Sequence, residues 1–196
     1  SCLYVKKYTT LTTGKFRNHF INLLEDLYPI EELMSFFYLL AEKYLNLSRI
    51  NIAFQLNNEL TPEEQSSFYQ AVDRLRNHEP IQYILGETEF FGMPIIVNKQ
   101  VLIPRPETEE LVSWIIDDVD KKETTILDIG TGSGCIAISL AKKLKSAVVS
   151  AIDISNKAIE VAKKNALINN VNVKYSSVDV LNFKDKLVLQ DKWKSK

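Results

Sequence analysis

The chain of 196 residues is poor in the residue types that build disulfide-linked or metal-bound folds. It has two cysteines, Cys2 and Cys135, and two histidines. Two cysteines are too few for a disulfide framework, and no Cys/His spacing is typical of a metal site. We therefore expect no bound metal, and a protein of the reducing cytoplasm.

Long apolar runs and an excess of charge of one sign are also missing. No stretch approaches the roughly 18 uninterrupted apolar residues of a membrane-spanning helix. The formal net charge is −1, with 24 basic and 25 acidic residues, so bulk charge favours neither nucleic acid nor a membrane as partner. Lys6 and Lys7 precede polar threonines rather than an apolar core, which is unlike a signal peptide.

The first 86 residues have the spacing of amphipathic helices. Apolar residues recur at helical intervals from Phe16 to Leu27 and again from Leu33 to Leu45. Thr61 begins a Thr-Pro-Glu-Glu sequence that supplies an N-cap, a proline at the first helical position and a capping box. We predict a helical domain over 1–86, with its apolar stripes packed into a core.

The pattern changes after residue 86. Short apolar stretches flank Gly92-Met93 and predict a β-hairpin linker over 87–103. Apolar strands then alternate with helices, the strands at 124–129, 147–153 and 171–178 and the helices at 135–145 and 156–168. Such alternation predicts an α/β domain over 104–196 with a mainly parallel sheet.

A glycine-rich turn follows the strand predicted at 124–129. It consists of Gly130, Thr131, Gly132, Ser133 and Gly134. Glycines let the backbone turn sharply and approach a ligand, and the next helix would point its amides toward that ligand. Ligands of doubly wound folds bind at the carboxyl ends of strands. Asp153 ends the next strand, where its carboxylate can accept both hydrogen bonds of a ribose diol.

The spacing of the turn indicates which cofactor binds. A dinucleotide fingerprint needs a glycine where Cys135 stands. Asp128, two residues before the turn, would attract a sulfonium or amino group and repel a pyrophosphate. The pattern D-x-G-x-G-x-G resembles motif I of class I S-adenosylmethionine-dependent methyltransferases. In those enzymes an acid such as Asp179, at the end of the third strand, commonly meets the adenine amino group; a strand-end turn role explains Asp179 equally well.

Several segments between 79 and 170 resemble the release-factor glutamine methyltransferase family (HemK-type). They are EPIQYILG at 79–86, FFG at 90–92 and LIPRPETE at 102–109, the last being close to that family's most distinctive signature. The resemblance implies an incomplete class I (Rossmann-like) methyltransferase domain behind a helical bundle that helps engage the release factor. It also implies that the cofactor site includes Arg105, Glu107 and Thr108.

The family methylates the amide nitrogen of the glutamine in the Gly-Gly-Gln motif of peptide-chain release factors. An amide nitrogen is a poor nucleophile because its lone pair is delocalised, so the site must position it and stabilise charge. The family uses an Asn-Pro-Pro-Tyr motif for this. None of the six prolines here are adjacent, so the motif is absent. The chain ends just after Lys192-Trp193-Lys194, about where the family approaches its fourth strand. We therefore expect a truncated chain that has no catalytic residue and is inactive alone.

A sheet without the fourth strand would leave the strand at 124–129 as an apolar edge with unpaired backbone groups. We expect that edge to recruit a partner strand, by swapping or edge pairing.

Three other functions stay open. A methyltransferase acting on exocyclic amines of nucleic acid is disfavoured by the neutral charge. A nicotinamide oxidoreductase is disfavoured by the glycine spacing. The third is a non-catalytic module that binds cofactor or release factor only.

Overall fold

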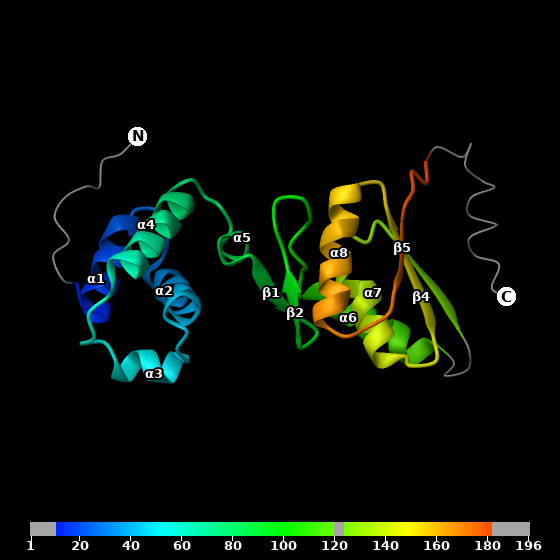
Figure 1. Cartoon of the computed structure of the whole chain (residues 1–196), viewed down its shortest axis with the longest axis horizontal. Helices are drawn as coiled ribbons and strands as arrows, with labels where there is room; N and C mark the ends of the chain where they lie inside the picture. The colour runs from blue at the N-terminus through cyan, green and yellow to red at the C-terminus, as the bar shows by residue number, and fades with distance from the viewer. Residues whose placement is uncertain (1–10, 120–123, 182–196) are drawn as a thin grey trace. The chain divides into compact units, whose positions relative to one another are not determined.

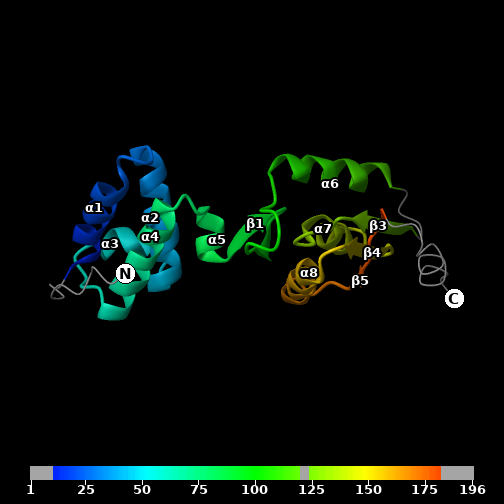
Figure 2. The same ribbon diagram turned by 90° about the horizontal axis from the view of Figure 1, so that it is seen from above.

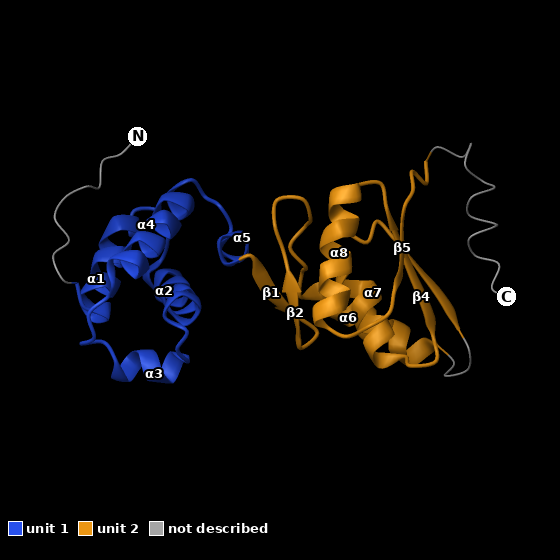
Figure 3. Cartoon of the chain, in the orientation of Figure 1, with its two compact units in different colours: residues 1–85 blue, residues 86–196 orange. Residues whose placement is uncertain are grey.

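The computed structural model describes residues 11–119 and 124–181, and the chain divides into two compact units, residues 1–85 and 86–196 (Figure 3). Each unit has its own core and is described separately below. The hairpin segment clusters with the second unit. Cys2 and the segment at 192–194 lie outside the described residues.

The first unit is helical, as the apolar spacing predicts (Figure 1). Its core contains the aromatic side chains of Phe16, Phe20, Phe37 and Phe68, all fully buried. Phe37 stacks on Phe68 with ring centroids 5.8 Å apart, and this packing holds α1, α2 and α4 together. The helices are α1 (Thr13–Leu24), α2 (Ile30–Leu45), α3 (Arg49–Phe54), α4 (Pro62–Arg76) and α5 (Ile81–Leu85).

Arg74 at the end of α4 folds the segment at 79–85 back onto that helix. Its guanidinium donates to both carboxylate oxygens of Glu79, at 2.8 and 2.9 Å. It also donates to the carbonyls of Tyr83, at 2.9 Å, and Ile84, at 3.4 Å. The capping box predicted at Thr61 is confirmed at the other end of the same helix. The segment EPIQYILG is therefore held by a planar, fork-shaped donor that matches a carboxylate.

The second unit is an α/β fold, which confirms the predicted class (Figures 1 and 2). Strands β3, β4 and β5 form a parallel sheet in that order, and β1 and β2 form an antiparallel hairpin. Helices α7 and α8 connect the three parallel strands and contact each other. The elements are β1 (Glu87–Phe90), β2 (Met93–Ile96), α6 (Glu107–Asp118), β3 (Thr125–Ile129), α7 (Cys135–Lys143), β4 (Val148–Asp153), α8 (Asn156–Ile168) and β5 (Lys174–Ser177).

The hairpin turn differs from the sequence-based expectation by one residue. The turn consists of Phe91 and Gly92, with φ of 53° and 71°, rather than Gly92 and Met93. Two consecutive positive φ angles are typical of the tight hairpin turn whose twist matches its strands. Met93 begins β2 instead, because its side chain is buried against Ile138 and Ala166.

Strand β3 forms one edge of the parallel sheet within residues 124–181. Leu127 is 41% exposed and Ile129 58% exposed. The apolar edge expected from the sequence is therefore present in the described part of the sheet. Among the described helices, none has both the length and the apolar character that crossing a membrane requires.

Candidate functional site

The glycine turn joins β3 to α7 with its three glycines at positive φ: 76° at Gly130, 53° at Gly132 and 82° at Gly134. A Cβ placed on Gly130 or Gly132 would meet no atom within 4 Å, so both point toward open space. A Cβ on Gly134 would lie 3.0 Å from the Cβ of Ala162 and 3.1 Å from Ile138. The first two glycines thus leave the backbone uncovered on that side, and the third lets α7 pack closely on α8.

Four amides of the turn, those of Gly130, Thr131, Gly132 and Gly134, are bonded within the protein. That the amides of the following helix face a ligand stays a prediction. The N–H groups of Gly130 and Thr131 donate to the carbonyl of Ile152, at 2.9 and 3.0 Å. The N–H of Gly132 donates to Asp153 Oδ2, at 2.9 Å, and that of Gly134 to the carbonyl of Thr131, at 2.8 Å. A pyrophosphate bound at such a turn would need these donors. The turn therefore suits a neutral or cationic ligand better than an anionic one.

Asp153 connects the turn to a pocket at the carboxyl ends of β3, β4 and β5. Besides Gly132, its carboxylate accepts the N–H of Ser155 at 2.9 Å through Oδ1. A carboxylate offers about four lone-pair sites, so two bonds leave room for further donors. The pocket has a volume of about 150 Å³. Its lining residues are Ile129, Gly130, Ile152, Asp153, Ile154, Val178, Asp179, Val180 and Leu181.

The pocket brings together three of the residues singled out from the sequence: Gly130, Asp153 and Asp179. The rest of its wall is aliphatic. Such a combination, apolar walls with a few polar groups, is typical of small-molecule sites. Its volume is below the roughly 300–1,000 Å³ usual for whole-ligand pockets, so it can enclose one part of a nucleoside-sized ligand.

Asp128 lies beneath the turn rather than in the lining of this pocket. Its Oδ2 accepts the hydroxyl of Thr131 at 2.7 Å. Burial raises the pKa of Asp128 and the charge of Asp153 adds to this, whereas hydrogen bonds from Thr131 and from the N–H of Ala137 lower it. A cation bound at the turn would stabilise the ionised form of this half-buried acid.

Cys135 is buried in the first turn of α7. Burial raises the pKa of its thiol, despite opposing hydrogen bonds from Ser133 and nearby amides. A thiol with a raised pKa is a poor nucleophile at neutral pH. Cys135 is therefore a packing residue.

The other predicted site residues, Arg105, Glu107 and Thr108, stand at the start of α6 and outside the pocket lining. Arg105 and Glu107 are exposed, and the N–H of Thr108 donates to the carbonyl of Arg105 at 3.0 Å. Their neighbour Glu109 accepts the N–H of Phe91 at 2.8 Å and so ties α6 to the hairpin turn. A cofactor role for the first three stays a prediction, whereas Glu109 has a visible structural one.

Two residues with buried polar groups near the turn were not singled out from the sequence. Asn165 of α8 is fully buried, and the hydroxyl of Tyr175 on β5 is buried with no hydrogen-bond partner among the described residues. Burial and the charge of Asp128 raise the pKa of Tyr175. The sequence does hold a signal for Asn165, because it interrupts the apolar face that Ala158 and Ala162 begin on α8.

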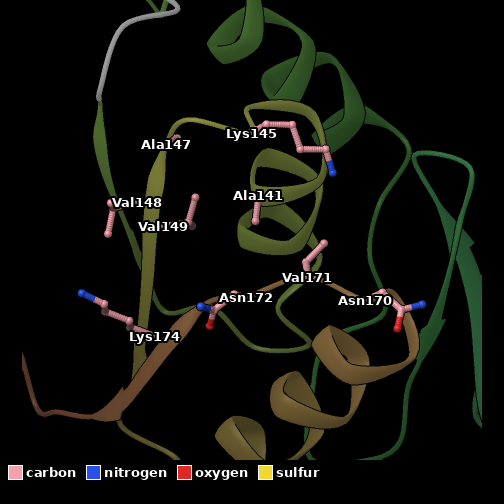
Figure 4. A pocket seen from close by; sticks show the side chains of 9 residues that line it. All are labelled: Ala141, Lys145, Ala147, Val148, Val149, Asn170, Val171, Asn172 and Lys174. Atoms are coloured by element: carbon pink, nitrogen blue, oxygen red, sulfur yellow. The ribbon is translucent and has the colours of Figure 1, made fainter.

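A larger cavity, of about 400 Å³, lies where β4 and β5 begin (Figure 4). Its lining residues are Ala141, Lys145, Ala147, Val148, Val149, Asn170, Val171, Asn172 and Lys174. This is the end of the strands opposite to the glycine turn. Ligands of open α/β sheets bind outside the carboxyl ends of the strands, so we place the candidate site at the turn.

Residues 11–119 and 124–181 contain no cluster of His, Cys, Asp and Glu that could hold a metal ion.

Two family models match separate parts of this chain. The model of the PrmC N-terminal domain matches residues 16–86, and that of the ribosomal protein L11 methyltransferase (PrmA) matches residues 106–192. The release factor glutamine methyltransferase of Flavobacterium psychrophilum is 45% identical over 174 residues, which cover 87% of this chain and 61% of that protein. The resemblance to the release factor glutamine methyltransferases is confirmed.

A second relative of the same name, from Streptococcus pneumoniae, is 44% identical over 129 residues and covers 65% of this chain. The chain spans 61% of the Flavobacterium relative and 46% of the Streptococcus relative. Solved structures give weaker likenesses. The Pyrococcus abyssi tRNA (uracil-54, C5)-methyltransferase in complex with S-adenosyl-L-homocysteine is 24% identical, over 47% of this chain and 23% of its own, with a TM-score of 0.41.

Proposed function

We propose that this chain is the helical and cofactor-binding part of a methyltransferase that uses S-adenosylmethionine. Its substrate would be the side-chain amide of the glutamine in the Gly-Gly-Gln motif of peptide-chain release factors. The observation that carries the proposal is the pocket shared by Gly130, Asp153 and Asp179. That pocket lies in a chain 45% identical, over 174 residues, to a protein named for this activity.

The residues around the pocket fit an adenosine-containing cofactor with a positive charge. Asp153 can accept from the ribose hydroxyls, and Asp179 from the adenine amino group. Aliphatic side chains, among them Val180 and Leu181, offer the base an apolar wall. Asp128 provides negative charge under the turn. When bound, S-adenosylmethionine supplies a methyl group activated by its sulfonium, and these residues bind and orient it.

The family positions the acceptor amide with an Asn-Pro-Pro-Tyr motif, and these 196 residues do not contain that sequence. We therefore propose that they bind cofactor without transferring its methyl group. Incubation with radiolabelled cofactor and unmodified release factor should give no incorporation above background, with a full-length relative as positive control. Robust methyl incorporation would contradict this proposal.

The helical unit, of which residues 16–86 match the model of the PrmC N-terminal domain, would bind the release factor. Such a substrate places the protein in the cytoplasm and makes direct contact with nucleic acid unnecessary. The first unit alone, residues 1–85, and the whole chain should both retain an immobilised release factor. Retention that needs residues 86–196 would move the binding surface to the second unit.

Calorimetric titration separates the candidate cofactors. We expect S-adenosylhomocysteine to bind and NAD to give no heat, because four amides of the turn are already bonded and Asp128 beneath it would repel a pyrophosphate. Asp153→Ala should abolish the binding, and Asp73→Ala, on the exposed side of α4, is the matched control. Binding of NAD with S-adenosylhomocysteine inert would favour an oxidoreductase instead.

A further inference from the structure

The side chain of Asn165 connects the hairpin to the glycine turn from the middle of α8. Its Oδ1 accepts the N–H of Ile96 at 2.7 Å. Its Nδ2 donates to the carbonyl of Ile96 and to that of Ser133, both at 2.9 Å. Both amide protons and the amide oxygen are therefore engaged, inside a site where Asn165 is fully buried.

The hydrogen bonds from Asn165 to the backbone of Ile96 satisfy β2 where a neighbouring strand would otherwise pair with it. Ile96 is opposite Glu87 in the hairpin, and both of its backbone polar groups face Asn165 rather than β1. Two residues earlier, Pro94 has no N–H to satisfy, and its carbonyl accepts from Nδ2 of Asn169 at 2.8 Å. The outer edge of β2 is thus satisfied by two asparagine amides one helical turn apart.

The two asparagines differ in where their remaining bond goes. Nδ2 of Asn169 donates to the carbonyl of Asn165, within α8, at 2.9 Å. Nδ2 of Asn165 reaches the carbonyl of Ser133 in the turn. That carbonyl belongs to the peptide group that precedes Gly134, whose φ of 82° is the left-handed conformation. Anchoring the carbonyl fixes the orientation of this peptide.

We propose that Asn165 is a positioning residue, which holds the glycine turn in its ligand-binding conformation and couples that conformation to the hairpin. The proposal rests on the proposed function only in taking S-adenosylmethionine or its product as the ligand of the turn. Without Asn165, the part-buried N–H and carbonyl of Ile96 and the buried carbonyl of Ser133 lose their partners, and the peptide at Ser133 can rotate. A ligand then has to restore the turn as it binds, which weakens its affinity.

The pair Asn165→Leu and Asn169→Leu tests this, because both substitutions are in the same helix and both remove two Nδ2 bonds. Asn165→Leu also removes the bond that Oδ1 accepts from Ile96. Calorimetry with S-adenosylhomocysteine should show affinity falling on the order of tenfold in Asn165→Leu and by no more than about threefold in Asn169→Leu. Thermal unfolding of both variants shows how far each fold is weakened. Equal losses of affinity in the two variants would overturn the proposal.

Asn165→Asp adds a test that a merely structural role would not pass. The carboxylate can still accept the N–H of Ile96, but it faces two carbonyls to which it cannot donate. Its protonated form regains one donor, and burial favours that form. Its affinity relative to the unsubstituted chain should therefore improve as the pH falls from about 8 to about 5.5. A ratio that does not change with pH would count against the proposal.

Amide hydrogen exchange gives a readout without ligand. The N–H of Gly134 is bonded to the carbonyl of Thr131 at 2.8 Å, and its exchange reports opening of the turn. Asn165→Leu should accelerate this exchange, and Asn169→Leu should leave it near the original rate. Should the unsubstituted chain fail to bind S-adenosylhomocysteine, the cofactor assignment fails while the exchange rates still decide the role of Asn165. Equal exchange at Gly134 in both variants would refute that role.

Discussion

The two units of the chain bury different kinds of side chain. Most of the largest fully buried side chains belong to the helical unit, with Phe16, Phe20, Phe37 and Phe68 among them. The α/β unit buries mainly small aliphatic residues. It also holds most of the buried polar residues among those described: Thr131, Ser133, Ser139, Ser150, Asn165 and Asn169.

The buried side chains therefore have different roles in the two units. Aromatic packing stabilises the helical unit, but its core contains few polar groups that could bind a ligand. In the α/β unit two of these buried residues form hydrogen bonds at the glycine turn, Thr131 with Asp128 and Asn165 with the carbonyl of Ser133. Hydrogen-bonded polar cores contribute little net stability, yet they specify one arrangement. Substitutions in the helical core should therefore mainly lower the free energy of unfolding, whereas substitutions around the glycine turn should mainly lower ligand affinity.

The largest effect on stability is expected from Phe37→Ala in the helical unit. Phe37 is fully buried and stacks on Phe68, so its removal leaves a cavity that costs about 3–5 kcal/mol of unfolding free energy. Urea denaturation followed by circular dichroism measures this loss. Phe54→Ala, at a position 84% exposed, is the control and should change the unfolding free energy by no more than about 0.5 kcal/mol. Affinity for S-adenosylhomocysteine should be unchanged; a parallel loss would show that the units are not independent.

Gly134→Ala should have the next largest effect, in the α/β unit. A methyl group there would lie 3.0 Å from Ala162 while φ is 82°, and both strain and crowding follow. We expect a loss of about 2–3 kcal/mol of unfolding free energy. Gly130→Ala is the matched comparison, with φ of 76° but open space around the Cβ, and should cost only about 1–2 kcal/mol.

The two glycine variants should also differ in their affinity for S-adenosylhomocysteine. Gly130 lines the pocket. Gly130→Ala should therefore weaken the binding of S-adenosylhomocysteine more than its small loss of stability suggests. Calorimetry beside denaturation separates the two quantities. If both glycine variants lose stability equally, Gly134 has no special packing role between α7 and α8.

Local signals in the sequence predict the elements well. Ser155 accepts the N–H of Ala158 and begins α8 where the sequence places it, and Asn169 ends that helix as expected. The capping box at Thr61 is another such signal. Each depends on residues within a few positions, so the chain encodes it without knowledge of the tertiary fold.

The polar contacts around the turn could not be predicted in this way. The bond from Gly132 to Asp153 joins residues 21 positions apart, and those from Ile96 to Asn165 span 69 positions. They exist because the hairpin packs on α8 and β4 lies beside β3, and neither arrangement follows from local propensity. The sequence indicated that Gly130, Asp153 and Asp179 meet, since parallel strands bring their carboxyl ends together; it did not indicate which amides of the turn stay available.

Asp128→Asn tests whether negative charge beneath the turn serves binding at the expense of stability. Burial raises the pKa of Asp128, so the native state binds this proton at higher pH than the unfolded chain does. Its contribution to stability is complete below the unfolded pKa and is lost as the pH rises through the raised native pKa. The variant cannot titrate there, so its unfolding free energy relative to the unsubstituted chain should increase as the pH rises through that window.

Urea denaturation across acid to neutral pH measures this difference, and Asp73→Asn, an exposed acid on α4, is the control. The same Asp128→Asn variant should bind S-adenosylmethionine more weakly, and lose more affinity for it than for uncharged S-adenosylhomocysteine. An equal loss for both ligands would show that Asp128 acts through hydrogen bonds alone.

The smallest change in folding stability is expected at the edge strand β3, where the α/β unit exposes apolar side chains. Leu127, 41% exposed, can become lysine at a cost of about 0.5 kcal/mol or less. A lysine on an edge strand opposes pairing with another chain. Sedimentation should therefore show concentration-dependent association in the unsubstituted chain and less of it in Leu127→Lys. Leu167→Lys, on the exposed face of α8, removes an apolar group elsewhere and should leave association unchanged. A monodisperse monomer at all concentrations would show that this edge, unlike the buried cores of both units, is satisfied without a partner strand.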